Sequence, residues 1–173
     1  VATNAGGNKA VKYGTTRNQI YGMKIVTPTG DIVDVGARLQ KCSTGYCLEQ
    51  LICGSEGTLG VVTEITLKLR PLPPYKFDLV AIFNEDAKAF ALPNKILKAG
   101  IEPTSIEYMD NKALKMCSNF CKVTLPHVEE NCCYVIITIE SFDEDELDKK
   151  MEKISDLCDD MGAVDVIQAA DRI

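Results

Sequence analysis

The sequence is poor in histidine and aromatic side chains: its 173 residues include one histidine, His127, and no tryptophan. A Ser/His/Asp triad or a histidine-rich metal centre confined to this chain is therefore nearly excluded. His127 follows Pro126, and we interpret it as a surface-loop residue. We assign no catalytic residue and no metal ligand within the chain.

Basic residues are outnumbered by acidic ones, 19 to 25, which gives a formal net charge of -6 and a pI near 4.9. Because phosphate backbones are bound by clustered lysine and arginine, this balance argues against nucleic acid as the main partner. Much of the acid lies between Asp143 and Asp160, which we interpret as the solvated face of a helix.

Long apolar runs are also missing, since none approaches the roughly 20 residues that span a bilayer. There is no basic and then apolar leader. We expect a globular protein that is cytoplasmic, or at most peripheral to the inner membrane. The sequence begins within a motif at Val1, so we also expect the chain to be a portion of a longer protein.

The eight cysteines include no CxxC pair. Without a secretory leader they are better interpreted as reduced thiols than as a disulfide framework. Their spacings do not match the usual zinc or thioredoxin motifs. We expect most of them to be small buried hydrophobic residues.

The most informative stretch is the glycine-rich loop Gly54–Gly60, which lies between an apolar run and a β-patterned run. Glycines allow a flat or charged ligand to approach main-chain N–H groups closely. A second glycine-bearing stretch covers residues 3–7 and is followed by Tyr13 and Gly14. Two such loops suggest a shared ligand.

Around these loops the first half of the chain has a β pattern. Residues 19–27 and 32–35 read as a hairpin joined by a Pro- and Gly-containing turn. Residues 47–53 read as a short helix that ends at Gly54, with Leu48, Leu51 and Ile52 as its apolar set. Residues 62–69 alternate as a half-buried strand, with Ile65, Leu67 and Leu69 on one side.

Pro71, Pro73 and Pro74 stop regular structure, and we place a domain boundary near residue 74. Beyond it, strands are expected at 77–83, 104–108, 133–140 and 163–168. Helices are expected at 85–99, kinked or split by Pro93, at 111–120, and at 144–161. The last helix has an Asp143 cap and ends at Gly162. The β-α-β-(α)-β-α-β order fits a ferredoxin-like α+β fold for residues 75–173.

Residues 1–73 contain four motifs in this order: Asn-Ala-Gly-Gly, Lys-Tyr-Gly, Thr-Gly-Tyr and Gly-Ser-Glu-Gly-Thr-Leu-Gly. Together they resemble the motifs of the FAD-linked 2-hydroxyacid dehydrogenases and oxidases. This group contains glycolate oxidase D-subunits, D-lactate dehydrogenases and D-2-hydroxyglutarate dehydrogenases within the vanillyl-alcohol oxidase superfamily. The resemblance implies that residues 1–74 are the second subdomain of a PCMH-type FAD-binding domain, an antiparallel sheet with flanking helices. Residues 75–173 would begin the substrate-covering cap.

The same resemblance implies a flavoprotein that transfers hydride from a small 2-hydroxy acid to FAD and passes electrons to a quinone, an electron-transfer flavoprotein or an iron-sulfur subunit. The flavin side would be lined by Thr3, Asn4, Ala5, Gly6 and Gly7, the phosphate and ribose region by Tyr13 and Gly14, and the adenosine end by Glu56, Gly57, Gly60, Val61 and Val62. From the residues alone, Asn4 could instead cap a turn, and Tyr13 could instead be a core aromatic residue. Arg17 is expected to be a surface or structural residue.

One position departs from the family pattern, because Cys47 stands where Thr-Gly-Tyr is usually followed by aspartate. Family members also carry a further FAD subdomain, a substrate-binding arginine and a histidine-rich segment that this chain lacks. Two alternatives therefore stay open: a non-catalytic fragment that self-associates, as a homo-oligomer, and a related FAD-dependent reductase of the cell-wall precursor type.

Overall fold

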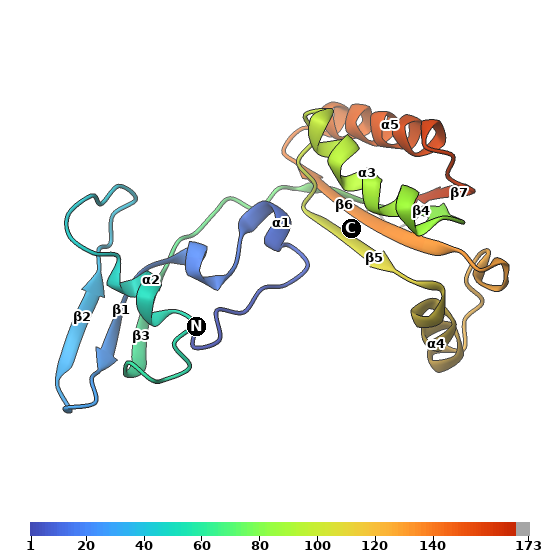
Figure 1. Cartoon of the computed structure of the whole chain (residues 1–173). Coiled ribbons are helices and arrows are strands. Elements are labelled where there is room, and N and C mark those ends of the chain that lie inside the picture. Colours follow the sequence, from blue (N-terminus) through green and yellow to red (C-terminus); the bar gives the residue numbers. More distant parts are fainter. Residues whose placement is uncertain (169–173) are drawn as a thin grey trace. The chain divides into compact units, whose positions relative to one another are not determined.

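The structure is a computed structural model that describes residues 1–168. The chain divides into two compact units, Val1–Pro71 and Leu72–Ile173, which meet within the proline-containing stretch 71–74 (Figure 1). Each unit has its own sheet and its own core, and each is described by itself.

The first unit is a three-stranded antiparallel sheet with order β2-β1-β3. Its strands are β1 (Ile20–Val26), β2 (Ile32–Gly36) and β3 (Val61–Leu67). The expected hairpin joins β1 and β2, with Val26 paired to Ile32. Short helices α1 (Ala10–Tyr13), η1 (Thr16–Gln19) and α2 (Leu48–Ile52) complete the unit.

The core of the first unit is small and lies under α2, which packs against β1 and β2. Its buried residues are Ile20, Met23, Ile25, Val35, Ile52 and Cys53. The expectation of a half-buried β3 is wrong in this structure: Ile65 is 44% exposed and Leu67 53%. The reason is that β3 is an edge strand and that α2, only five residues long, reaches the other two strands. For the same reason Ile52 is buried, whereas Leu48 and Leu51 are exposed.

The second unit has a four-stranded antiparallel sheet with order β5-β6-β4-β7. Its strands are β4 (Tyr75–Phe83), β5 (Ser105–Met109), β6 (Cys133–Ser141) and β7 (Asp165–Gln168). Its helices are α3 (Asp86–Lys98), α4 (Asn111–Cys121), η2 (Val128–Glu130) and α5 (Glu144–Asp160). This order and topology confirm the ferredoxin-like α+β prediction.

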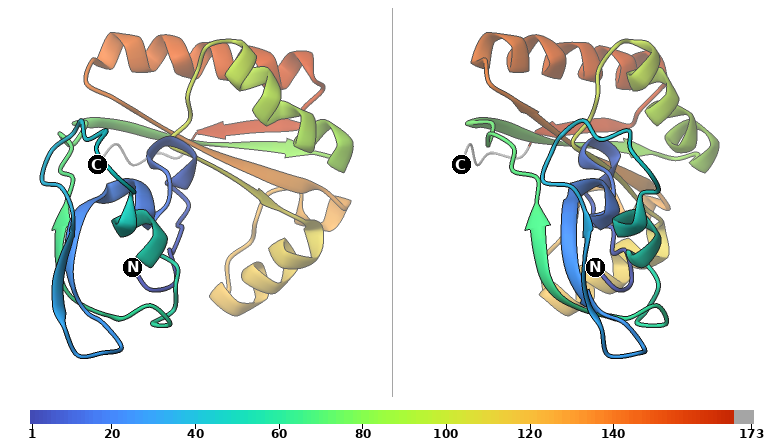
Figure 2. Two further views of the ribbon diagram at one scale, coloured as in Figure 1. Left: turned by 60° about the vertical axis from the view of Figure 1, so that its left-hand side comes forward. Right: turned by 90° about the vertical axis from the view of Figure 1, so that its left-hand side faces the viewer.

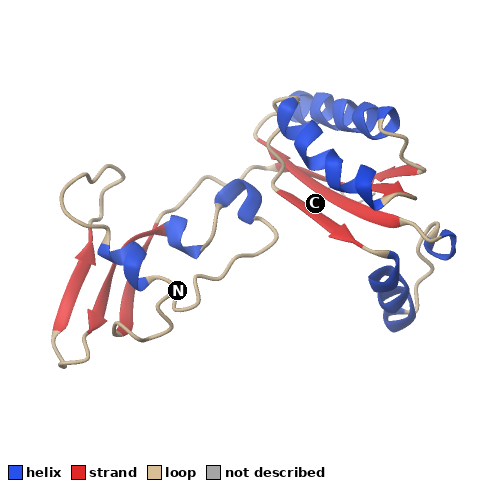
Figure 3. Ribbon diagram, viewed as in Figure 1, coloured by secondary structure: helices blue, strands red, loops and turns tan. Residues whose placement is uncertain are grey.

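The helices α3 and α5 lie side by side on one face of this sheet, and α4 lies on the other (Figures 2 and 3). The main core therefore forms between the sheet and the α3–α5 layer, around residues such as Leu79, Leu92, Ile137 and Ile154. Pro93 lies within α3 without splitting it.

The α5 helix begins as the sequence predicts. The Asp143 carboxylate Oδ1 accepts a hydrogen bond from the backbone N–H of Glu146 at 2.8 Å. The helix ends before Gly162, which has a φ of 74°. Burial of Leu147, Ile154 and Cys158 leaves the acidic side chains of α5 on its solvent side.

The cysteines differ from expectation in one respect. All eight are free thiols, but only Cys53, Cys132, Cys133 and Cys158 are buried, so the prediction that most are core residues is wrong. Burial raises the pKa of the Cys133 thiol to about 11 and that of Cys158 to about 12. Within residues 1–168, no helix is both long and apolar enough to cross a membrane.

Candidate functional site

The two glycine-bearing loops lie against each other, although about fifty residues separate them in sequence. The Val1 carbonyl oxygen accepts hydrogen bonds from the N–H of Asn4 at 2.9 Å and from that of Gly54 at 3.1 Å. The Ala2 carbonyl accepts one from the N–H of Glu56 at 2.9 Å. Backbone bonds therefore join the start of the chain to the loop Gly54–Gly60 and make them one structure.

Side chains of Asn4 and Arg17 reinforce this junction. The Asn4 side-chain Oδ1 accepts a hydrogen bond from the Arg17 backbone N–H at 2.9 Å, and the Cys53 thiol lies 3.6 Å from the same oxygen. The Arg17 guanidinium Nη2 donates to the Cys53 carbonyl at 2.8 Å. Arg17 is thus the structural residue that was expected, and the loops are held through its contacts.

Gly54 has to be glycine at this junction. Its φ is 92°, and a Cβ there would lie 3.2 Å from the Asn4 Cβ and 3.3 Å from the Arg17 Nη2. The contact between Arg17 and Cys53 could not be predicted from the sequence, because 36 positions separate them and neither belongs to a motif.

A cavity of about 370 Å³ opens beside the joined loops. Four residues of the predicted adenosine end line it, namely Gly57, Gly60, Val61 and Val62, together with Val1, Ala2, Ile52, Ser55 and Ile65. The lining is mostly small and apolar, as suits the flat face of a ring system bound through main-chain groups. The exposed side of β3 forms one wall of the cavity. Ile65, which was expected to be buried, therefore lies at the edge of this cavity.

The three residues Glu56, Gly57 and Gly60 shape the loop for different reasons. Glu56 and Gly57 have positive φ values of 50° and 82° within a turn that the N–H of Thr58 closes on the Ser55 carbonyl. Nothing lies within 4 Å of a Cβ built on Gly57, so the space beside it is open. A Cβ on Gly60 would meet the Val26 carbonyl oxygen at 2.7 Å. Contact with β1 therefore requires glycine at position 60, independently of any ligand.

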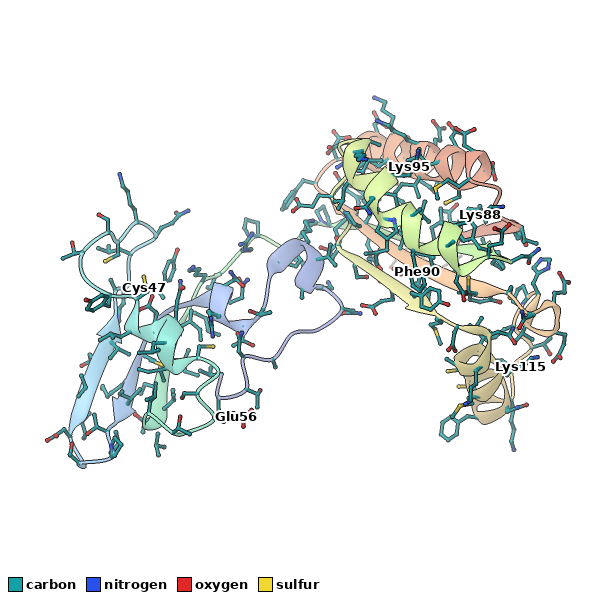
Figure 4. The ribbon with its side chains drawn as sticks, in the orientation of Figure 1. Cys47, Glu56, Lys88, Phe90, Lys95 and Lys115 are labelled. Carbon is teal, nitrogen blue, oxygen red and sulfur yellow. The ribbon has the colours of Figure 1, made fainter. Side chains whose placement is uncertain are left out.

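Glu56 lies in the turn beside the cavity but is not among the residues that line it. Its backbone N–H is already bonded to Ala2, and its side chain lies on the surface of the loop (Figure 4). Its part in the site is to fix the turn that places Gly57.

Tyr13 and Gly14 do not line this cavity. The Tyr13 ring is half-buried, with the Lys12 ammonium 5.2 Å and the Arg70 guanidinium carbon 5.6 Å from its centroid, within the range of cation–π contacts. Gly14 has a φ of 77°, and a Cβ there would lie 2.5 Å from the Asn18 Oδ1. Lys12, Arg70 and the Tyr13 ring thus form a second, positively charged surface cluster in the first unit.

The remaining predicted residues, Thr3, Ala5, Gly6 and Gly7, are exposed. The Ala5 carbonyl accepts hydrogen bonds from the N–H and the hydroxyl of Thr16, at 3.0 and 2.8 Å. Nothing lies within 4 Å of a Cβ built on Gly7. This part of the loop is anchored at Ala5 and open at its glycines.

Cys47, the position that departs from the family pattern, is the N-cap of α2. Its side chain is exposed and makes no capping hydrogen bond (Figure 4). An aspartate there would supply the capping carboxylate that a thiol cannot. In residues 1–168, no group of three or more side chains that could hold a metal ion is found.

Residues 72–172 match the family described as FAD linked oxidases, C-terminal domain. The chain belongs to this family. FAD is accordingly its cofactor, and the open glycines and small apolar walls of the cavity fit a flat ring. The match spans the second unit, whose residues 75–173 the sequence predicts to begin a substrate-covering cap.

Several curated relatives extend the similarity across both units. The chain is 37% identical to an uncharacterized FAD-linked oxidoreductase of Mycobacterium tuberculosis over 95% of its own length and 37% of that protein. It is 36% identical to a D-lactate dehydrogenase of Anaerostipes hadrus, over 98% and 36%. It is 35% identical to the glycolate oxidase subunit GlcD of Bacillus subtilis, over 94% and 34%. The chain spans about a third of the length of these relatives.

Among solved structures, alkyldihydroxyacetonephosphate synthase superposes with a TM-score of 0.75 at 23% identity. The match covers 96% of this chain and 31% of that one. At this identity the similarity establishes the fold, which is a mixed helix and antiparallel-sheet fold of the FAD-linked oxidase type.

Proposed function

We propose that this chain is part of a flavoenzyme that oxidises a small 2-hydroxy acid, such as glycolate or D-lactate, to the 2-oxo acid. The observation that carries the proposal is the hydrogen-bonded junction of the two glycine-bearing loops beside an apolar cavity. Relatives named D-lactate dehydrogenase and glycolate oxidase support the substrate class. When bound, FAD would accept the hydride from the α-carbon as the hydroxyl proton is released, and the two electrons would pass to a separate acceptor such as a quinone, an electron-transfer flavoprotein or an iron-sulfur subunit.

In this proposal the residues of the chain bind and orient the cofactor. Gly57, Val61 and Val62 offer an apolar wall to the adenosine end, and Gly6 and Gly7 offer open backbone on the other loop. Asn4 and Arg17 act indirectly, because their hydrogen bonds hold the two loops in position against each other. Lys12 and Arg70, which lie over the Tyr13 ring, provide positive charge for the phosphate region.

The proposal assigns residues 1–74 to the second half of the FAD-binding domain and residues 75–173 to the first part of the cap. The isolated chain is proposed to be catalytically inactive, because affinity and chemistry both need a ligand that is enclosed. The cavity beside Gly57 is bounded on one side by the exposed Ile65 of β3 and is open beyond it. We place the enzyme in the cytoplasm.

The test uses the full-length gene product. We expect it to purify with bound flavin and to reduce a dye with D-lactate, glycolate or D-2-hydroxyglutarate. A full-length protein that stays colourless and inactive after FAD is added would contradict the proposal. Titration of FAD into the 173-residue chain should show weak binding or none, whereas micromolar or tighter binding would refute the view that the site is incomplete.

A further inference from the structure

The outer surface of α3 is basic, which is unusual in an acidic chain, and it carries small residues beside the exposed side chains of Phe90 and Leu97. The helix carries Lys88, Lys95 and Lys98 against one acidic residue, Asp86. Among residues 1–168, neither Lys95 nor Lys98 forms an ion pair. Because Ala89, Leu92 and Ile96 are buried, the helical period places Ala87, Ala91 and Asn94 on the side farthest from the sheet. Small residues at that position let another helix approach closely.

The outer surface of α5 has the opposite charge. Leu147, Ile154 and Cys158 point into the core, so the period of the helix places Asp145, Glu152, Asp156 and Asp160 on the solvent side. All four are exposed. Lys149 and Lys153 lie on the same side. The Lys153 ammonium makes a hydrogen bond within the unit, to the Ala99 carbonyl at 2.8 Å.

The two helices lie side by side and run in opposite directions, with α3 inclined to α5 (Figure 2). The Lys153–Ala99 bond joins the middle of α5 to the end of α3, and the Lys88 ammonium lies near Gly162 at the end of α5. The layer therefore has a basic half, which is α3, and an acidic half, which is α5.

We propose that this layer binds a second copy of the chain. A two-fold axis that lies above the layer, in the plane of the contact, and runs lengthwise between the two helices places α3 of each copy over α5 of the other. The contact is isologous, so the same charge pairing is made twice. Axial position is preserved by this axis, which sets Lys95 and Lys98 of one copy against Glu152 and its neighbours in the other, and Lys88 against the acidic end of α5.

The size of the layer sets the strength of the contact. A helix of 13 residues is about 20 Å long, and two neighbouring helices are together about 20 Å wide, so the layer covers roughly 400 Å². A standard interface buries about 800 Å² per partner. The dimer is accordingly weak, and its stability depends on complementary charge and on ionic strength.

Sedimentation equilibrium of the 173-residue chain tests this inference. We expect the weight-average mass to rise with concentration at low salt and to fall to that of the monomer at high salt. The α3 variant K95E/K98E and the α5 variant E152K/D156K should each weaken self-association by about tenfold or more. An equimolar mixture of the two should restore it, because both contacts of the mixed dimer again pair opposite charges.

A charge-matched control separates pairing from net charge. K41E/K112E alters the net charge as much as K95E/K98E, at exposed sites outside the layer, and should weaken the dimer far less. The inference is overturned if the chain stays monomeric at millimolar concentration in low salt, if neither layer variant changes the association, or if the mixture does not restore it. Circular dichroism confirms that each variant is folded.

Discussion

The side chain of Asn4 accepts a hydrogen bond from the backbone N–H of Arg17 at 2.9 Å, and Asn4 itself has a φ of 49°. Both features depend on asparagine, which accepts through its amide oxygen and tolerates the left-handed region. Asn4 is therefore a structural residue of the loop junction, whatever it contributes to the ligand.

Asn4→Ala should destabilise the junction by roughly 2 kcal/mol, because it leaves the Arg17 N–H without its acceptor and forces alanine to a positive φ. The measurement is the hydrogen-exchange rate of the Arg17 amide, which should increase. Asn4→Asp retains an acceptor oxygen and should protect the amide nearly as well. If Arg17 exchanges equally slowly in the alanine variant, the bond does not hold the loop.

Gly60 and Gly57 should respond differently to alanine. Gly60→Ala brings a Cβ to 2.7 Å from the Val26 carbonyl oxygen and should cost roughly 2–4 kcal/mol of folding free energy. Gly57→Ala meets no atom within 4 Å and pays only for its positive φ, roughly 1–2 kcal/mol. Urea unfolding of the chain measures both.

The same pair also tests the cavity in the full-length protein. Gly57→Ala should yield soluble protein with reduced flavin content, because its methyl group enters the open cavity. Gly60→Ala should instead reduce the amount of folded protein. Normal flavin content in the Gly57 variant would show that the cofactor does not approach this glycine.

Much of the second unit could be predicted, because its signals are local. The alternating strands, the Asp143 cap and the buried stripe of α5 fix the ferredoxin-like order without knowledge of distant contacts. The first unit could be predicted less well. The period of two in β3 shows which side chains share a face, but it cannot show that α2 stops short of covering Ile65 and Leu67. The Arg17–Cys53 bond joins positions with no common motif.

Cys47→Asp should stabilise the first unit by roughly 0.5–1 kcal/mol. Cys47 is the N-cap of α2 and its side chain makes no capping bond, whereas an aspartate carboxylate can accept a hydrogen bond from the backbone N–H of Glu49. Thermal unfolding of the chain measures the change. Cys47→Ala removes the thiol without adding an acceptor and should have little effect. Equal midpoints for the Asp and Ala variants would show that the missing aspartate has no capping role.

His127 should make the second unit more stable in acid than in base. Its Nδ1 lies 3.0 Å from the Glu130 carboxylate and its Nε2 3.4 Å from that of Asp165. The hydrogen bond to Glu130 is the main cause that raises the pKa of His127 above its usual value. A raised folded-state pKa gives stability that is fully present below the unfolded value of about 6.5 and is lost as pH rises through the folded one.

Urea unfolding at two pH values measures this effect. The wild type should exceed His127→Gln in stability at a pH of about 5.5, and the difference should shrink at about 9. High salt should reduce the acid-side difference, since all three side chains are partly exposed. A difference that is constant with pH would mean that the imidazole acts only through packing.

Thr104→Val should stabilise the second unit. The Thr104 side chain is completely buried, and its hydroxyl has no hydrogen-bond partner among the described residues. Folding therefore removes this hydroxyl from water, and no hydrogen bond within the protein offsets the desolvation free energy. Valine has the same shape and should raise the free energy of unfolding by about 1 kcal/mol.

Thr138→Val is the matched control on β6: the Thr138 hydroxyl donates to the Asp78 carboxylate, so its removal should lower stability by a similar amount. The two substitutions are chemically identical, and only the presence of a partner differs between them. If Thr104→Val lowers the urea midpoint as Thr138→Val does, the Thr104 hydroxyl has a hydrogen-bond partner in solution.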